Sequence, residues 1–153
     1  MNIVIVKYNA GNIRSVLYAL ERIGSCAEVT DEPDKILQAD KVIFPGVGEA
    51  SSAMRYLRER ELDRLLISLK QPVLGICLGM QLMCAHSEEN DTTCLGIFGE
   101  SVLRFQSGSE GLKVPQIGWN TIHSLQSPLF KGIPEQTYCY FVHSYYAQAG
   151  DHT

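Results

Sequence analysis

Short runs of β-branched and apolar residues alternate with helical patterns in the first half of the sequence. The runs are residues 2–8, 26–30, 41–50 and 72–76. After the first run, Asn12 can cap a helix whose apolar residues recur at helical spacing, and Gly24 can end it. Helical sequence also follows the third run, through about Leu69. This alternation predicts an α/β fold in which helices wrap a parallel sheet.

The pattern changes beyond about residue 87. A polar loop is followed by runs that are typical of antiparallel strands and hairpins, at residues 101–105, 119–125 and 137–147. The sequence contains no repeat and no low-complexity linker. We therefore expect one domain over residues 1–153, with an antiparallel extension after the parallel sheet.

Composition excludes several classes of function. A net charge of -4 leaves no basic footprint for nucleic acid or an anionic membrane. The apolar run at residues 3–6 is too short for a signal peptide, and no segment is long enough to span a bilayer. Five cysteines without a C-x-x-C pair indicate a reduced, cytoplasmic protein with no zinc site. We expect neither a metal nor another cofactor.

One cysteine follows the fourth predicted strand in a distinctive setting. Gly75-Ile76-Cys77-Leu78-Gly79 has the G-x-nucleophile-x-G form of a turn from strand to helix. The helix N-terminus there favours the thiolate over the thiol. An arbitrary cysteine is more often a small core residue, but two glycines at these offsets favour the nucleophile.

Two backbone segments can supply an oxyanion hole beside this cysteine. The N–H of Leu78 is the next donor along the turn, and Pro45-Gly46-Val47-Gly48 ends the neighbouring strand. An N–H of Val47 or Gly48 can then converge on the same sheet edge, as acyl transfer requires. An ordinary strand-to-helix turn is an equally good interpretation of the second segment taken alone.

The catalytic base is harder to place among the four histidines. His86 precedes Glu88, but nine residues of helix put it roughly 13 Å along the axis from Cys77. His143 can approach the site on a strand, although a hydrogen-bonded structural histidine is the more common case. His123 and His152 attract no specific argument, the first in a predicted hairpin and the second near a terminus.

Four motifs together resemble one family. They are Pro45-Gly46-Val47-Gly48, Gly75 to Gln81, Pro115-Gln116-Ile117-Gly118-Trp119-Asn120 and Phe141-Val142-His143-Ser144-Tyr145. In order and spacing they resemble the class I glutamine amidotransferases, and most closely the glutaminase subunits of imidazole glycerol phosphate synthase. The resemblance covers the whole chain. It implies a flavodoxin-like fold with a parallel central sheet, helices on both faces and an antiparallel extension.

The resemblance also implies a reaction and the residues that perform it. Cys77 would attack the side-chain amide of glutamine, release ammonia and form a thioester that water hydrolyses to glutamate. The N–H groups of Val47 and Leu78 would form the oxyanion hole, Val47 after a peptide flip. The remaining implied residues would bind the substrate: Gly48, Gln81, Ser144 and Tyr145.

A partner is implied in the same way. Asn12, Trp119 and Asn120 correspond to a face that docks on a (β/α)8 cyclase subunit in a heterodimer of histidine biosynthesis. Ammonia would travel through that barrel to a phosphoribulosyl formimino nucleotide. Nothing in the resemblance implies a cofactor.

One departure from the family concerns the base. The family carries its histidine and carboxylate in a late His-Pro-Glu segment, and this sequence has none. We expect the chain to be truncated at its C-terminus and residues 1–153 alone to be inactive in turnover. The alternatives are another class I glutaminase, such as one serving anthranilate or carbamoyl phosphate synthesis, and a non-catalytic subunit that only regulates the barrel.

Overall fold

The fold was analysed in a computed structural model that describes residues 1–107, 113–150 and 153. The chain divides into two compact units. The first comprises Met1–Leu103 with Ala147–Thr153, and the second Arg104–Tyr146. A single domain over residues 1–153 stays a prediction.

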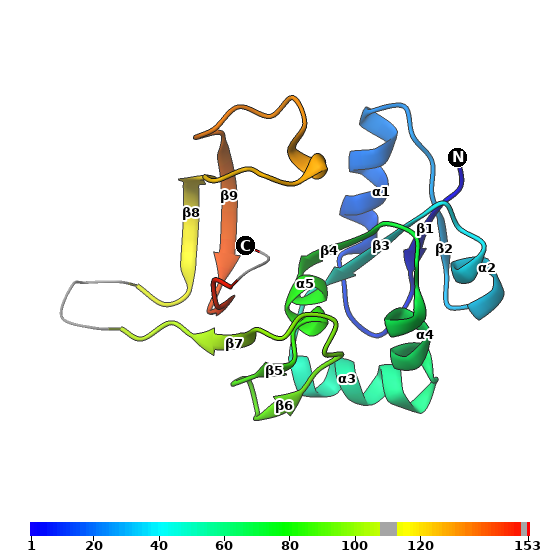
Figure 1. Cartoon of the computed structure of the whole chain (residues 1–153), viewed down its shortest axis with the longest axis horizontal. Helices are drawn as coiled ribbons and strands as arrows, with labels where there is room; N and C mark the ends of the chain where they lie inside the picture. The colour runs from blue at the N-terminus through cyan, green and yellow to red at the C-terminus, as the bar shows by residue number, and fades with distance from the viewer. Residues whose placement is uncertain (108–112, 151–152) are drawn as a thin grey trace. The chain divides into compact units, whose positions relative to one another are not determined.

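The first unit contains the predicted parallel sheet. Its four strands are β1 (Ile3–Val6), β2 (Glu28–Thr30), β3 (Lys41–Gly46) and β4 (Val73–Cys77). They lie in the order β2-β1-β3-β4, and every neighbouring pair is parallel (Figure 1). Each of the four runs singled out in the sequence therefore contains a strand, and the α/β class is confirmed.

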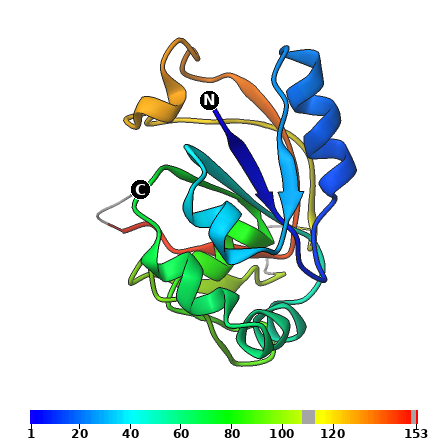
Figure 2. The same cartoon turned by 90° about the vertical axis from the view of Figure 1, so that its right-hand side faces the viewer.

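Helices lie on both faces of this sheet. The helix α1 (Ile13–Arg22) lies on one side of the sheet (Figure 2). Its apolar side chains pack against Ile3, Ile5 and Ile43. The other face is covered by α2 (Pro33–Leu37), α3 (Ala50–Glu59), α4 (Leu62–Ser68) and α5 (Leu78–Met83). Fully buried side chains such as Phe44, Met54 and Leu82 form this larger core. The predicted wrapping by helices is confirmed.

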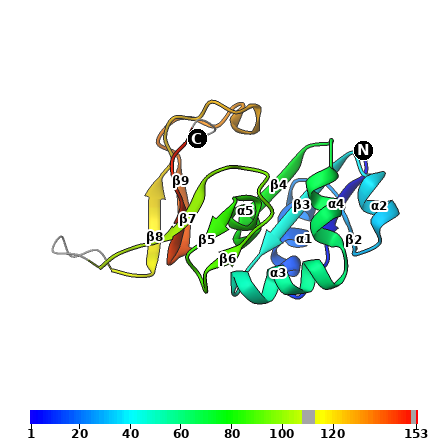
Figure 3. The same cartoon turned by 60° about the horizontal axis from the view of Figure 1, so that its bottom comes forward.

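The helical stretch that follows β3 is two helices rather than one. Glu61 adopts a left-handed conformation (φ 56°), which ends α3 and lets α4 start in a new direction (Figure 3). Leu57 and Leu62 are nevertheless both buried in the same core. The apolar spacing thus identified the buried side of both helices but not the break between them.

Three short strands follow α5. They are β5 (His86–Ser87), β6 (Thr92–Thr93) and β7 (Ser101–Arg104). The pair β5 and β6 is antiparallel, but β5 and β7 are parallel. The expectation that residues 101–105 form an antiparallel strand is therefore wrong for the pairing with β5, because the chain crosses over between the two strands instead of turning back in a hairpin.

The second unit is built on one antiparallel pair, as predicted. Strands β8 (Gln116–Thr121) and β9 (Tyr138–His143) pair along their whole length, and a short 3-10 helix (Pro128–Phe130) lies in the connection. The predicted strand at residues 137–147 is interrupted at Ser144, after which β10 (Tyr145–Ala147) begins. Among the described residues, no helix is both long and apolar enough to cross a membrane.

Candidate active site

The turn at Cys77 has the strained geometry that its glycine spacing predicts. Cys77 ends β4 and precedes α5, with φ 52° and ψ -118°. Residues other than glycine rarely adopt a positive φ, and those that do concentrate at functional sites. The side chain is exposed, unlike Cys84 and Cys94, which are buried. The reading of Cys77 as a core residue therefore does not fit.

The glycines around this turn are required by packing. A Cβ on Gly79 would collide with the Phe44 carbonyl oxygen, and one on Gly75 would lie 2.7 Å from the Cα of Met80. Both contacts are closer than a real Cβ atom makes with a neighbouring heavy atom. The start of α5 consequently lies directly against β3, and its backbone is held there tightly.

Pro45-Gly46-Val47-Gly48, called here the oxyanion segment, reaches the same sheet edge as Cys77. In the register of β3 with β4, Gly46 is the partner of Cys77, so Val47 leaves the sheet beside the turn. Val47 is half exposed, and Gly48 has φ 108° with no heavy atom within 4 Å of the position that a Cβ would take. Leu78 is the first residue of α5, with its side chain buried. This arrangement is compatible with both proposed donors, since parallel strands bring their carboxyl ends to one edge.

The far end of the oxyanion segment is fixed by residues that the sequence analysis missed. The N–H of Ala50 donates to the Glu89 carboxylate at 2.8 Å, and the Asn90 side chain donates to the carboxylate of Glu49. The N-cap residue of α3 is Glu49, but it is the Glu89 carboxylate, 39 residues from Ala50, that accepts the first N–H of the helix. Because this contact is not local in sequence, no pattern in the chain indicates it.

Two other predicted residues lie in the first unit. Gln81 is buried on α5, one helical turn beyond Cys77. Asn12 is the N-cap of α1, as predicted, and its side chain accepts a hydrogen bond from the N–H of Ser15 at 3.2 Å. A structural role therefore accounts for Asn12 whether or not it also contacts a partner.

In the second unit, His143 is a hydrogen-bonded histidine among aromatic rings. Its Nδ1 lies 2.8 Å from the carbonyl oxygen of Tyr145, and a carbonyl can only accept, so Nδ1 carries the proton. The rings of Phe105 and Phe141 lie 5.1 and 5.8 Å from the imidazole, centroid to centroid. The carbonyl of Ser144 accepts from the N–H of Phe105 at 3.0 Å. These contacts favour the structural interpretation of His143.

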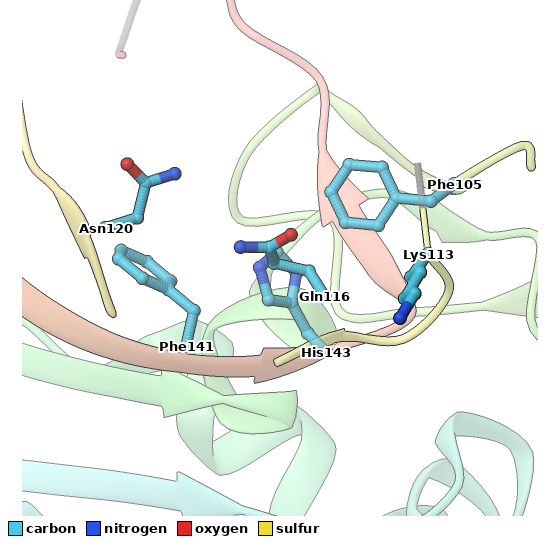
Figure 4. A pocket seen from close by; sticks show the side chains of 6 residues that line it. All are labelled: Phe105, Lys113, Gln116, Asn120, Phe141 and His143. Atoms are coloured by element: carbon cyan, nitrogen blue, oxygen red, sulfur yellow. The ribbon is translucent and has the colours of Figure 1, made fainter. Parts of the chain in front are cut away.

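A cavity of about 290 Å³ lies on the face of the β8–β9 pair that carries the His143 side chain. Figure 4 shows the side chains that line it. It is lined by Phe105, Lys113, Gln116, Asn120, Phe141 and His143. The lining thus combines two phenyl rings with amide, ammonium and imidazole groups.

The other two described histidines bond to near neighbours. His86 lies on β5 beyond the end of α5, and its Nε2 is 2.8 Å from the carboxylate of Asp91. His123 shares a hydrogen bond of 2.7 Å with the Thr121 hydroxyl. His152 lies outside the described residues.

Trp119 and Asn120 point to opposite faces of the β8–β9 pair. Trp119 is 68% exposed, and its ring meets that of Tyr140 edge to face at 5.5 Å. Asn120 instead lines the cavity. The exposed face around Trp119 consists of large apolar side chains, namely Ile117, Trp119, Tyr138, Tyr140 and Val142.

No cluster of three or more potential metal ligands occurs in the part of the chain that the structure describes.

Comparison with known proteins identifies the class to which this fold and turn belong. The profile of the family "Glutamine amidotransferase class-I" matches residues 4–152. A solved structure described as a glutamine amidotransferase superposes with a TM-score of 0.71 at 18% identity, over 99% of this chain and 76% of the other. The chain therefore belongs to the class I glutamine amidotransferases.

Within this class, the chain is similar to one kind of subunit. It is 54% identical to the "Imidazole glycerol phosphate synthase subunit HisH" of Bacteroides fragilis, over 100% of its own length and 78% of the relative's. The protein of the same name from Shewanella loihica is 43% identical, over 98% of this chain and 70% of the relative. The family resemblance drawn from the motifs is thus confirmed.

Proposed function

We propose that this chain carries the nucleophile of a glutaminase subunit that hydrolyses L-glutamine to glutamate and ammonia for imidazole glycerol phosphate synthesis, and that residues 1–153 alone do not turn over, because they contain no His-Pro-Glu segment. The observation that carries the proposal is Cys77, held exposed at a positive φ between a parallel strand and a helix N-terminus. The identity of 54% to a HisH subunit supports the choice of this reaction over those of other class I glutaminases.

In the proposed reaction, the Cys77 thiolate adds to the amide carbon of glutamine. A carbon–sulfur bond forms, and the carbonyl oxygen becomes an oxyanion that the N–H groups of Val47 and Leu78 stabilise. The amide nitrogen then takes a proton, the carbonyl re-forms as the carbon–nitrogen bond breaks, ammonia leaves and a thioester remains. In the family that the motifs resemble, this proton passes through the histidine of a His-Pro-Glu segment, and residues 1–153 contain no such segment. Water hydrolyses the thioester and releases glutamate. We assign Gly48, Gln81, Ser144 and Tyr145 to glutamine binding.

The ammonia is proposed to pass to a (β/α)8 cyclase partner in the cytoplasm, within histidine biosynthesis. Support comes from the exposed apolar face around Trp119, since contiguous apolar surface of this kind marks interaction sites. The name of the relatives, a synthase subunit, implies a second subunit for those proteins. Asn12 and Asn120 are assigned to the same partner.

The proposed substrate can be tested with a chloroketone analogue of glutamine, which alkylates a thiol held at the substrate carbonyl. We expect modification of one thiol per chain at a rate that saturates with reagent concentration. Glutamine should protect against it, and asparagine, one methylene shorter, should protect poorly. A rate that rises linearly with reagent and ignores glutamine would contradict the proposal, because it would show alkylation without a binding site.

A further inference from the structure

Tyr8 is a buried tyrosine that no part of the proposed reaction uses. It follows β1, is 6% exposed, and its ring lies 5.2 Å from that of Phe44, centroid to centroid. Its hydroxyl donates to the carbonyl oxygen of Pro45 at 2.7 Å. Tyr8 therefore connects the centre of the sheet to the first residue of the oxyanion segment.

The hydroxyl also lies against the residue that pairs with the nucleophile. A Cβ on Gly46 would be 2.7 Å from the Tyr8 hydroxyl and 2.8 Å from the Cβ of Leu78. The phenol, the oxyanion segment and the first residue of α5 thus meet at Gly46. A small displacement of any one of them is transmitted to the other two, because no free space separates them.

The hydrogen bond to Pro45 orients a particular peptide group. The Pro45 carbonyl belongs to the peptide that links Pro45 to Gly46, and the next peptide carries the N–H of Val47. Glu89 and Asn90 hold the segment at its other end, through Ala50 and Glu49. Between these two anchors, Val47 and Gly48 are the part left without close packing, which suits a peptide that must turn its N–H toward an oxyanion.

We propose that Tyr8 is a positioning residue for the oxyanion hole, fixing through Pro45 the direction in which the Val47 N–H points; this inference rests on the proposed glutaminase function. Burial raises the pKa of the Tyr8 phenol well above its ordinary range, and the negative charge of a Cys77 thiolate raises it further. The phenol consequently keeps the proton that it donates while the thiolate is present.

Tyr8→Phe tests this role because it removes the hydroxyl and keeps the ring against Phe44. The chloroketone analogue of glutamine reports on the oxyanion hole, because the thiolate first adds to its carbonyl carbon and places the negative charge on the carbonyl oxygen. The carbonyl then re-forms as sulfur bonds to the methylene carbon and chloride leaves. Iodoacetamide alkylates the same thiol by direct displacement of iodide, with no oxyanion. We expect Tyr8→Phe to lower the saturating chloroketone rate by about 10- to 100-fold. The half-saturating concentration and the iodoacetamide rate at Cys77 should stay within about twofold.

Tyr56→Phe is the matched control. Tyr56 also packs on the main core, on α3, and the Arg60 guanidinium lies 4.7 Å above its ring. Losing that hydroxyl should leave both alkylation rates unchanged. If Tyr8→Phe does not fold by circular dichroism, para-aminophenylalanine at position 8 replaces it, since an aniline N–H keeps a donor of similar size. That variant should retain the native chloroketone rate.

Three results would overturn the inference. They are an unchanged chloroketone rate in Tyr8→Phe, an equal fall of the chloroketone and iodoacetamide rates, and a low chloroketone rate with the aniline donor in place. Failure of the proposed function looks different, because then the native chain itself would show no saturable alkylation at Cys77.

Discussion

Gly46 and Cys77 are partners in the parallel register of β3 and β4, each the last residue of its strand. The oxyanion segment and the exposed thiol therefore leave the sheet side by side. Gly79 then packs against Phe44 of β3, which holds the first turn of α5 beside both. The site depends on this close approach of three backbones.

Gly79→Ala should abolish or severely reduce folding. Its Cβ would collide with the Phe44 carbonyl oxygen, which is backbone and cannot rotate away. Overpacking costs about 1–3 kcal/mol when side chains can adjust, so we expect a loss of more than about 3 kcal/mol here. Urea denaturation followed by circular dichroism measures the free energy of unfolding.

Gly99→Ala is the control for this substitution. Gly99 has no heavy atom within 4 Å of the Cβ position, so its replacement should change stability by less than about 0.5 kcal/mol. Equal stability of the Gly79→Ala variant and the native chain would show that α5 does not press on β3.

The buried thiols should weaken the fold at alkaline pH. Burial is the main cause that raises the pKa of Cys94 to about 11, and the neighbouring Cys84 and Glu89 add to it. In the unfolded chain the thiol titrates near its ordinary value of about 8.5. The folded state therefore holds its proton more firmly, and this contribution to stability is complete below about pH 8.5 and lost as pH rises through about 11.

Cys94→Ala should flatten the decline of unfolding free energy between about pH 9 and 11, measured by urea denaturation at each pH. The absolute stability of the variant is expected to be lower at neutral pH, so the slope against pH is the informative quantity. Cys26→Ala, at an exposed thiol, should keep the native slope. A parallel slope in Cys94→Ala would show that this thiol does not cause the decline.

Trp119→Ala should weaken binding to the cyclase subunit of a HisH relative. Buried aromatic anchors cost about 2 kcal/mol or more when truncated, which corresponds to a roughly 30-fold higher Kd. The exposure of Trp119 argues against a core role, so its substitution should leave the melting temperature nearly unchanged. Isothermal titration calorimetry and thermal unfolding measure the two quantities.

Two variants complete this experiment. Ile67→Ala removes a side chain that is 51% exposed on α4 and should not change the Kd. Asn120→Ala tests the other face of the hairpin and should have a smaller effect than Trp119→Ala if the partner rests on the apolar face. Unchanged affinity of Trp119→Ala would contradict the assignment of that face.

The parallel sheet and the Cys77 turn could be predicted because local patterns determine them. Apolar runs fix the buried strands, and Gly75 with Gly79 identifies a turn whose packing admits no side chain. The break at Glu61 was missed, because the apolar spacing continues across it and the left-handed residue there is not a glycine.

Contacts between residues distant in sequence could not be predicted from local patterns. Glu89 accepts the first N–H of α3, and Tyr8 reaches Pro45 37 residues away, although neither residue belongs to a recognisable motif. The opposite orientation of Trp119 and Asn120, in contrast, follows from the alternation of side chains along a strand and could have been predicted from the sequence. That alternation places these neighbours on opposite faces, and the assignment of both to one partner stays a prediction.

The assignment of Cys77 as the nucleophile is tested most directly by finding which cysteine reacts at the glutamine site. The native chain is treated with the chloroketone analogue of glutamine, with and without glutamine, and modified peptides are identified and quantified by mass spectrometry. Cys77 should carry the modification, saturably and with protection by glutamine, while exposed Cys26 reacts slowly and without protection. Cys77→Ser should lose the protected modification, and Cys84→Ser and Cys139→Ser should keep it. Protected modification at Cys84 or Cys139 in the native chain would contradict the assignment of Cys77 as the nucleophile.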